Sequence, residues 1–166
     1  DKIIGLASTG LHSNGYSLIR RILELEHGAA GKAWHDTTLG QHLLTPTRLY
    51  VRSILELIGA CEVRALAHIT GGGITENLPR VLPRGAQAVV RKGSWEIHPI
   101  FTLLQQKAGV DDEEMYRDFN MGIGMILVVP AKQADGVMKK ARKLGEKAYL
   151  IGEIAKGKQV VKYAEK

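Results

Sequence analysis

The alternation of apolar and polar residues predicts helices and strands that are mixed along the whole chain. Short apolar runs rich in branched residues indicate strands, and apolar residues spaced three and four apart indicate helices. Strands are expected at Lys2–Ala7, 63–69, 87–91, Ile123–Val129, 149–153 and 160–163. Helices are expected at 15–26, 45–58, 75–82, 98–107, 111–116 and 131–144. This order predicts an α+β fold in α/β/α layers, with a mixed β-sheet covered by helices.

Two of these expectations concern the segment between the first two helices. Residues 28–44 are polar and punctuated by glycine, which predicts a loop. Thr45 is placed to cap the next helix, with Pro46 in its first turn. That helix should bury Leu49, Ile54, Leu55 and Ile58.

Composition limits the size and the setting of the protein. With 166 residues and 45% apolar residues, the chain fits one domain, residues 1–166, or one compact piece of a larger protein. It opens inside an element without an initiator Met, which suggests a fragment whose N-terminal portion was removed. The apolar runs are too short to span a bilayer, so no membrane partner is expected. Cys61 is alone, which excludes an internal disulfide and favours the cytoplasm.

The positive charge raises the question of nucleic acid. The net charge of +6 arises in residues 131–166, which carry ten Lys and Arg against four Asp and Glu; elsewhere there are thirteen of each. The basic run KKARK at 139–143 lies on a predicted helix and has no interleaved aromatic residues that could stack on bases. A solvated helix face is the favoured interpretation, and no nucleic-acid partner is expected.

Two strand-to-helix junctions share a design that could hold an anion. They are STGLHSNGY, residues 8–16, and HITGGGITENLPR, residues 68–80. Each places glycines and short polar side chains before a helix, where free backbone N–H groups and the helix dipole favour negative charge. Alternatively, the glycines only turn the chain and Ser13, Asn14 and Thr75 only cap helices. Neither junction fits a Walker or dinucleotide fingerprint. The occurrence of two such glycine junctions in one domain favours a polyanionic ligand.

The histidines provide fewer candidates for a ligand or metal site than the glycine junctions do. His12 lies inside the first junction and is the best candidate for touching a ligand, whereas His68, in a strand, is expected to be partly buried and satisfied. His98 precedes a proline and is expected to cap a helix, and residues 35–42 form a solvated loop. There is no HExxH motif and no pairing of Cys with His, so no metal site is predicted.

Two further stretches carry polar residues or glycines that could serve either packing or chemistry. Residues 111–114, DDEE, are expected to open a helix. In the stretch FNMGIGM, Gly122 and Gly124 indicate close approach of a ligand or of another part of the chain, and Asn120 is the polar residue to watch. No nucleophile–base pair or carboxylate dyad emerges, so the catalytic residues stay unknown.

Four blocks of the sequence resemble a known family. They are GLASTGLHSNGYSLIRRIL, LLTPTRLYV, AHITGGGITENLPRVLP and FNMGIGMILVV, which together extend over nearly the whole chain. In this order they are similar to the C-terminal domain of the aminoimidazole ribonucleotide synthetase (phosphoribosylformylglycinamidine cyclo-ligase) family.

The resemblance implies a two-domain, homodimeric, cytoplasmic enzyme of purine biosynthesis that uses ATP and Mg²⁺. It would phosphorylate the formyl oxygen of formylglycinamidine ribonucleotide, after which an amidine nitrogen closes the imidazole ring and ADP and phosphate leave. Such chemistry depends on phosphate positioning and charge neutralisation. The residues expected to bind substrate or phosphate are Ser8, Thr9, Gly10, His12, Ser13, Asn14, Gly15, Tyr16, Thr70, Gly71, Gly72, Gly73, Thr75, Glu76, Asn77 and Asn120.

The resemblance also implies what this chain lacks. The family's acidic metal-binding segment and its lysine-containing nucleotide motif belong to an N-terminal domain, so the isolated chain is expected to fold without turning over substrate. Two alternatives remain: the corresponding domain of a related phosphotransferase such as selenophosphate synthetase, or a non-catalytic module for anion binding or dimerisation.

Overall fold

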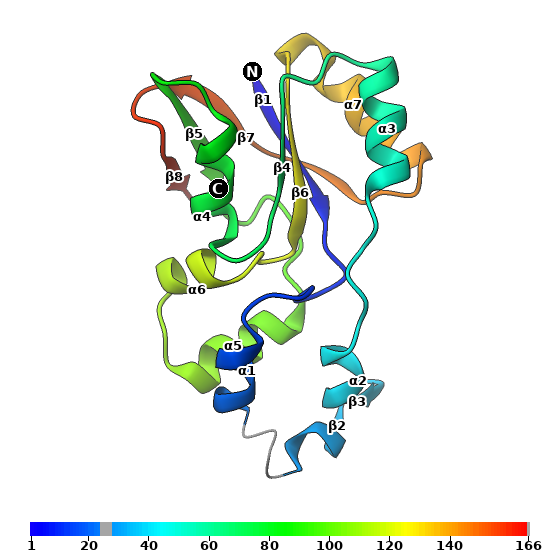
Figure 1. Ribbon diagram of the computed structural model, residues 1–166, viewed down its shortest axis with the longest axis vertical. Coiled ribbons are helices and arrows are strands. Elements are labelled where there is room, and N and C mark those ends of the chain that lie inside the picture. The colour runs from blue at the N-terminus through cyan, green and yellow to red at the C-terminus, as the bar shows by residue number, and fades with distance from the viewer. Residues whose placement is uncertain (24–27, 166) are drawn as a thin grey trace.

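A computed structural model shows a six-stranded mixed sheet with helices on both faces (Figure 1), which confirms the predicted α+β layers. It describes residues 1–23 and 28–165. The strand order is β4-β6-β1-β7-β5-β8, and every pair is antiparallel except β5 with β8. The strands are β1 Lys2–Ala7, β4 Ala65–His68, β5 Ala86–Arg91, β6 Ile123–Val129, β7 Ala148–Lys156 and β8 Val161–Ala164.

Alternation along the central strands divides the core between the two faces of the sheet. Ile4 and Leu127 point to one face, where α3 and α7 cover them with Leu57, Val137 and Ala141. Ile3 and Ile126 point to the other, where helices α1, α4, α5 and α6 bury residues including Ile74, Phe101, Leu104 and Met115. The helices are α1 Tyr16–Ile22, α2 Leu39–Leu43, α3 Val51–Ala60, α4 Gly73–Asn77, α5 Pro99–Ala108, α6 Asp112–Asp118 and α7 Ala134–Lys143.

Most predicted elements are confirmed with shifted ends. β1 and β6 occupy the predicted residues. The helix start predicted at residues 111–114 is also present, since Asp111 caps α6 by accepting a hydrogen bond from the Glu114 N–H. The basic residues of α7 lie mainly on its solvated face. The predicted helix 75–82 is replaced by α4 and a 3-10 turn, Leu78–Val81, because Pro79 lacks the N–H that a continuing helix needs. The 131–144 helix begins as a 3-10 turn, Ala131–Gln133. Residues 24–26 of the first predicted helix lie outside the described residues.

The loop predicted at 28–44 is wrong. A 3-10 turn, Ala29–Gly31, is followed by a two-stranded hairpin, β2 Ala33–Trp34 and β3 Thr37–Thr38, and then by α2. His35, at a φ of 52°, turns the hairpin. Thr38 and Gln41 form a reciprocal capping box that starts α2. Short elements with few apolar residues left no periodic signal in the sequence.

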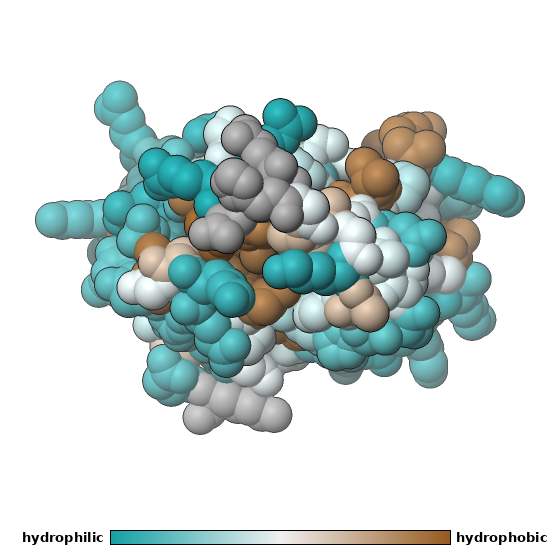
Figure 2. Space-filling view, turned by 90° about the horizontal axis from the view of Figure 1, so that it is seen from below, coloured by the Kyte–Doolittle hydropathy of each residue, from teal (hydrophilic) through white to brown (hydrophobic). Residues whose placement is uncertain are grey.

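The helix predicted at 45–58 is also wrong in its start and in its buried face. It begins at Val51, and the segment 45–50, which connects α2 to α3, has no helical structure. Leu49, Leu55 and Ile58 are 85%, 61% and 45% exposed, whereas Ser53 and Leu57 are buried. Of the four predicted residues, Ile54 alone packs against the core, and it is half-buried. Figure 2 shows apolar side chains at its right-hand margin, the side on which α3 lies. The helix therefore presents an apolar stripe to the surface.

Candidate functional site

The first glycine junction is fastened to the start of β6. The Ser8 N–H donates to the Gly122 carbonyl, and the Ser8 hydroxyl donates to Asn120 Oδ1 at 3.1 Å. Asn120 Nδ2 donates to the Gly10 carbonyl at 2.9 Å, and its Oδ1 also accepts from the Gly122 N–H at 2.8 Å. Asn120 is 1% exposed. Its amide thus holds the loop in place, and direct ligand contact by Asn120 stays a prediction.

His12 is the buried centre of this loop. It is 4% exposed and has a φ of 58°, a left-handed backbone that is uncommon outside glycine. The N–H groups of Thr9 and Arg48 donate to its Nε2, at 3.2 and 3.5 Å. Burial, and after it the positive charge of the nearby His68, His98 and Arg48, lowers the pKa of His12 to about 4. The ring is therefore neutral at pH 7, with its proton on Nδ1, a buried atom without a partner among the described residues.

The segment 45–50, which we call the strap, lies across the same loop. The Thr9 hydroxyl donates to the Pro46 carbonyl at 2.7 Å, and the Ser13 and Thr47 hydroxyls are 3.0 Å apart. Arg48 Nε donates to Glu146 Oε2 at 2.7 Å. These bonds explain why the strap is not helical, because its polar groups find partners outside any helix.

Two buried groups anchor the second half of the strap. Glu146, whose side chain is 2% exposed, also accepts a hydrogen bond from the Ser53 hydroxyl at 2.6 Å. The Tyr50 hydroxyl donates a hydrogen bond to the Ala7 carbonyl at 2.7 Å. Burial raises the pKa of this hydroxyl, so the group keeps its proton and stays a donor. The hydroxyl of Tyr16 binds the Leu43 carbonyl just before the strap.

The second glycine junction is held mainly by its own asparagine. Asn77 Nδ2 lies within hydrogen-bond distance of the Thr70, Gly71 and Gly73 carbonyls, at 3.3, 3.1 and 2.8 Å. Gly73 has a φ of 56° and packs against the Tyr116 and Phe119 carbonyls, where a side chain would collide. The Thr75 hydroxyl donates to the Tyr116 carbonyl. Gly71 and Glu76 remain exposed.

The capping alternative for the polar side chains is excluded. The N-cap residues of α1 and α4 are Gly15 and Gly72, both left-handed, and neither helix has a side-chain cap. Ser13 and Asn14 lie before the cap, exposed and half-buried. His98 does occupy the N-cap position of α5 without capping it; its Nε2 donates to the Ser8 carbonyl at 3.0 Å. These polar side chains are thus placed for some purpose other than starting a helix.

The sheet brings the two junctions to one edge. β1 and β4 are both antiparallel to β6, so they run parallel to each other and end on either side of the start of β6. There the rings of His12, Tyr50 and His68 form a row with centroid separations of 6.2 and 6.4 Å. Gly124 makes room for this row, since a side chain there would meet the Tyr50 hydroxyl and the His12 ring. The expectation that His68 is partly buried is wrong: it is exposed at the end of an edge strand.

Two cavities open beside the first junction, and most of their lining was not predicted. One, of about 400 Å³, is lined by Ser8, Thr9, Thr45, Arg48, Glu96, His98, Lys147 and Tyr149, among others. The other, of about 310 Å³, is lined by Thr9, Gly10, Thr45, His98 and the ring residues Trp34, His35 and His42, among others. The strap lies inside a family-like block and could have been suspected from it, whereas the hairpin carried no signal.

Two further properties concern metals and membranes. Within residues 1–23 and 28–165, no group of three or more His, Cys, Asp or Glu side chains is arranged to hold a metal ion. In the same residues, no helix is both long and apolar enough to cross a membrane.

The sequence of nearly the whole chain matches one protein family. Residues 1–164 match the profile of the AIR synthase related protein, C-terminal domain, and the chain belongs to this family. It is 52% identical to the phosphoribosylformylglycinamidine cyclo-ligase of Brevibacillus brevis over 166 residues, which cover 98% of this chain and 48% of that protein. For the cyclo-ligase of Syntrophotalea carbinolica the identity is 50%, over 94% of this chain and 45% of that protein. The chain thus spans about half the length of these relatives.

Solved structures show the same fold at low sequence identity. HypE, a hydrogenase maturation protein from E. coli, superposes with a TM-score of 0.61 at 19% identity, over 99% of this chain and 46% of that protein. Thiamine-monophosphate kinase from Stenotrophomonas maltophilia superposes with a TM-score of 0.61 at 20% identity, over 98% and 49%. At these identities the likeness concerns the fold alone.

Proposed function

We propose that this chain is the C-terminal half of an ATP-dependent cyclo-ligase that converts formylglycinamidine ribonucleotide to aminoimidazole ribonucleotide. The observation that carries the proposal is the 52% identity to a cyclo-ligase over 98% of this chain, a span that includes both glycine junctions. In this reaction ATP phosphorylates the formyl oxygen, the amidine nitrogen attacks that carbon, and ADP and phosphate leave as the imidazole ring forms.

The chain's own part in that reaction would be to bind and orient charged groups. The Ser13 side chain is exposed and that of Asn14 is half-buried, and the N–H groups of Gly71 and Gly72 have no backbone acceptor among the described residues. Fixed N–H and hydroxyl donors stabilise negative charge that develops on phosphate oxygens. The buried amides of Asn77 and Asn120 keep these donors in position.

The rest of the machinery would come from outside this chain. The described residues supply no cluster for Mg²⁺, so its ligands would lie on the other half of the enzyme. The exposed apolar stripe of α3, with Val51 67% and Leu55 61% exposed, supports burial against that half or against a second subunit of a homodimer. A cytoplasmic location follows from the proposed pathway.

A chimera tests this function. The chain is joined to the N-terminal half of the Brevibacillus brevis relative, and ADP release and aminoimidazole ribonucleotide formation are measured with the chimera and with the chain alone. The chimera should turn over and the chain alone should not. Asn14→Ala in the chimera should lower kcat/KM by about tenfold or more, because a hydrogen bond to a charged group is lost. Thr102→Ala, an exposed position on α5, is the matched control.

Three results would contradict the proposal. Turnover by the chain alone would show that no other half is required. Equal kcat/KM for Asn14→Ala and the control would remove the first junction from the site. A folded chimera that neither turns over nor binds ATP or the ribonucleotide would favour a non-catalytic module.

A further inference from the structure

The outer face of α3 is apolar, which is the reverse of an ordinary surface helix. Val51, Leu55 and Ile58 follow one another at spacings of four and three residues, so they lie on one side of the helix. They are 67%, 61% and 45% exposed. The polar Ser53 is buried instead, and its hydroxyl binds Glu146. An apolar stripe that a folded domain leaves in water marks a surface that another part of a protein covers.

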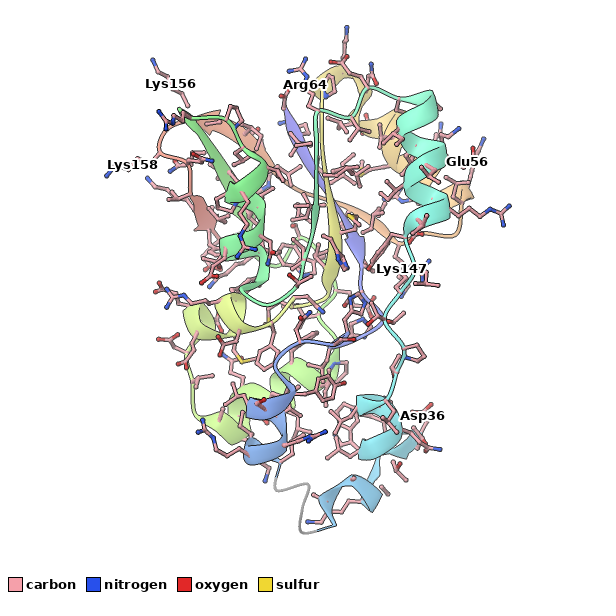
Figure 3. The ribbon with its side chains drawn as sticks, in the orientation of Figure 1. Asp36, Glu56, Arg64, Lys147, Lys156 and Lys158 are labelled. Atoms are coloured by element: carbon pink, nitrogen blue, oxygen red, sulfur yellow. The ribbon has the colours of Figure 1, made fainter. Side chains whose placement is uncertain are left out.

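An open hollow lies along this stripe. It has a volume of about 380 Å³ and is lined by Arg52, Leu55, Glu56, Gly59 and Ala60 of α3. A side chain added at Gly59 would meet nothing within 4 Å, so the hollow is open there. Figure 3 shows Glu56 on the outer side of the helix. The surface therefore offers a seat for apolar side chains, with one positive and one negative charge at its rim.

α3 runs between the first junction and the start of the chain. Its first residue follows the strap, in which Pro46 and Thr47 contact the first junction. Its last residue, Ala60, comes four residues before Arg64, whose Nη1 donates to both carboxylate oxygens of Asp1, at 2.7 and 2.9 Å. Figures 1 and 3 show the N-terminus and Arg64 at the end of the molecule where α3 ends.

The position of α3 indicates what covers it. The family model describes a C-terminal domain, and this chain spans about half the length of its relatives, so in the proposed enzyme the other half precedes Asp1. That half enters beside the end of α3 and completes a site at the first junction, beside the start of α3. Because a helix of ten residues is only about 15 Å long, a domain that reaches both places lies along it.

We propose that the outer face of α3, from Val51 to Ala60, is the seat of the N-terminal half of the same chain. That half buries Leu55 and fills the hollow beside Gly59 with apolar side chains. The inference rests on the proposed function and deepens it, because it names the surface that joins the two halves. It also assigns α3 to a contact within one subunit, so a homodimer would use other surfaces.

Thiol labelling measures whether this face is covered. Leu55→Cys is placed in a Cys61→Ala background, both in the chain alone and in the chimera with the N-terminal half of the Brevibacillus brevis relative. Labelling of position 55, followed by mass spectrometry, should be at least about tenfold slower in the chimera, because a covered thiol reacts only when the contact opens. Thr102→Cys, an exposed position on α5, is the control and should react equally fast in both.

Cross-linking identifies what covers the face. In the chimera, Leu55→Cys carries a photoreactive benzophenone, and digestion shows which peptides it captures. The expected product has the mass of one chain and joins α3 to a peptide of the N-terminal half. A product with the mass of two chains, or capture of residues 1–166 alone, would overturn the inference. Labelling of the chain alone that slows as its concentration rises would also overturn it, because a second copy would then cover the face.

A charge placed in the stripe should open the contact. In the chimera with an Ile58→Cys probe and the same background, Leu55→Lys should raise the labelling rate at least about fivefold, because burying a charge without a partner is costly. Thr102→Lys is the matched control and should leave the rate unchanged. Circular dichroism of the chain alone verifies that Leu55→Lys is folded. Equal rates for the two variants would contradict the inference.

These experiments separate the inference from the proposed function. A chimera that turns over substrate while Leu55→Cys reacts as fast as in the chain alone would overturn the inference and leave the proposed function standing. A chimera in which the face is covered by the N-terminal half but no product forms would support the inference and count against the proposed function.

Discussion

Replacing Asn120 with alanine tests whether its buried amide holds the first junction. The amide accepts from the Ser8 hydroxyl and the Gly122 N–H and donates to the Gly10 carbonyl. Asn120→Ala leaves these three buried groups without partners, and each unsatisfied group costs about 1–3 kcal/mol. Because the space left by the side chain can admit water, the low end applies to each. A loss of about 3 kcal/mol in the free energy of unfolding is expected.

For a domain of this size, such a loss lowers the melting temperature by roughly 6–12 °C. Urea denaturation followed by circular dichroism gives the free energy of unfolding directly, with the m-value checking that the unfolded state is unchanged. Asn14→Ala is the matched control, since Asn14 is a half-buried asparagine in the same loop without a side-chain hydrogen bond among the described residues. The control should change the stability by no more than about 0.5 kcal/mol.

The reasoning fails if Asn120→Ala loses less than about 1 kcal/mol. In that case the amide would not anchor the loop, and its burial would need another cause. A variant that keeps its stability but loses ligand affinity in the full enzyme would instead make Asn120 a direct ligand contact.

Three other substitutions test the site. Gly73→Ala forces a side chain into a left-handed position against backbone carbonyls, so it should lower the free energy of unfolding in urea by about 3 kcal/mol or more. Gly71→Ala, at a position that faces open space, should change it by no more than about 0.5 kcal/mol. Similar values for both would contradict the predicted collision. Glu146→Ala should cost about 2–3 kcal/mol, because the buried Ser53 hydroxyl loses its acceptor and Arg48 loses its ion pair. Glu96→Ala, in an exposed pair, should cost at most about 1 kcal/mol, and equal losses would mean that burial of the pair is unimportant. The pKa of His12, about 4 in the folded protein, lies below its ordinary value of 6.5, so the unfolded chain binds the proton first and stability should fall as the pH drops from 6.5 to 4. His12→Asn should flatten that pH dependence, and an unchanged slope would assign it to other groups.

The sequence by itself determined the central layers of the protein. The apolar residues of β1 and β6 alternate between the two faces of one sheet, so both strands could be predicted at their observed ends. The glycine junctions were also visible, because positive φ angles at Gly15, Gly72 and Gly73 favour a residue without a side chain. These signals are local, since each depends on neighbouring residues alone.

Only the tertiary structure decided what surrounds the first junction. The helix predicted from Thr45 and Pro46 does not form over the strap. Arg48 and Tyr50 instead bind Glu146 and Ala7, which are far away in the sequence. The two cavities depend in the same way on Lys147 and Trp34, which the fold brings beside the first junction from distant segments. Pairings of this kind leave no periodic pattern along the chain, because a hydrogen bond or an ion pair between distant residues depends on how the elements pack.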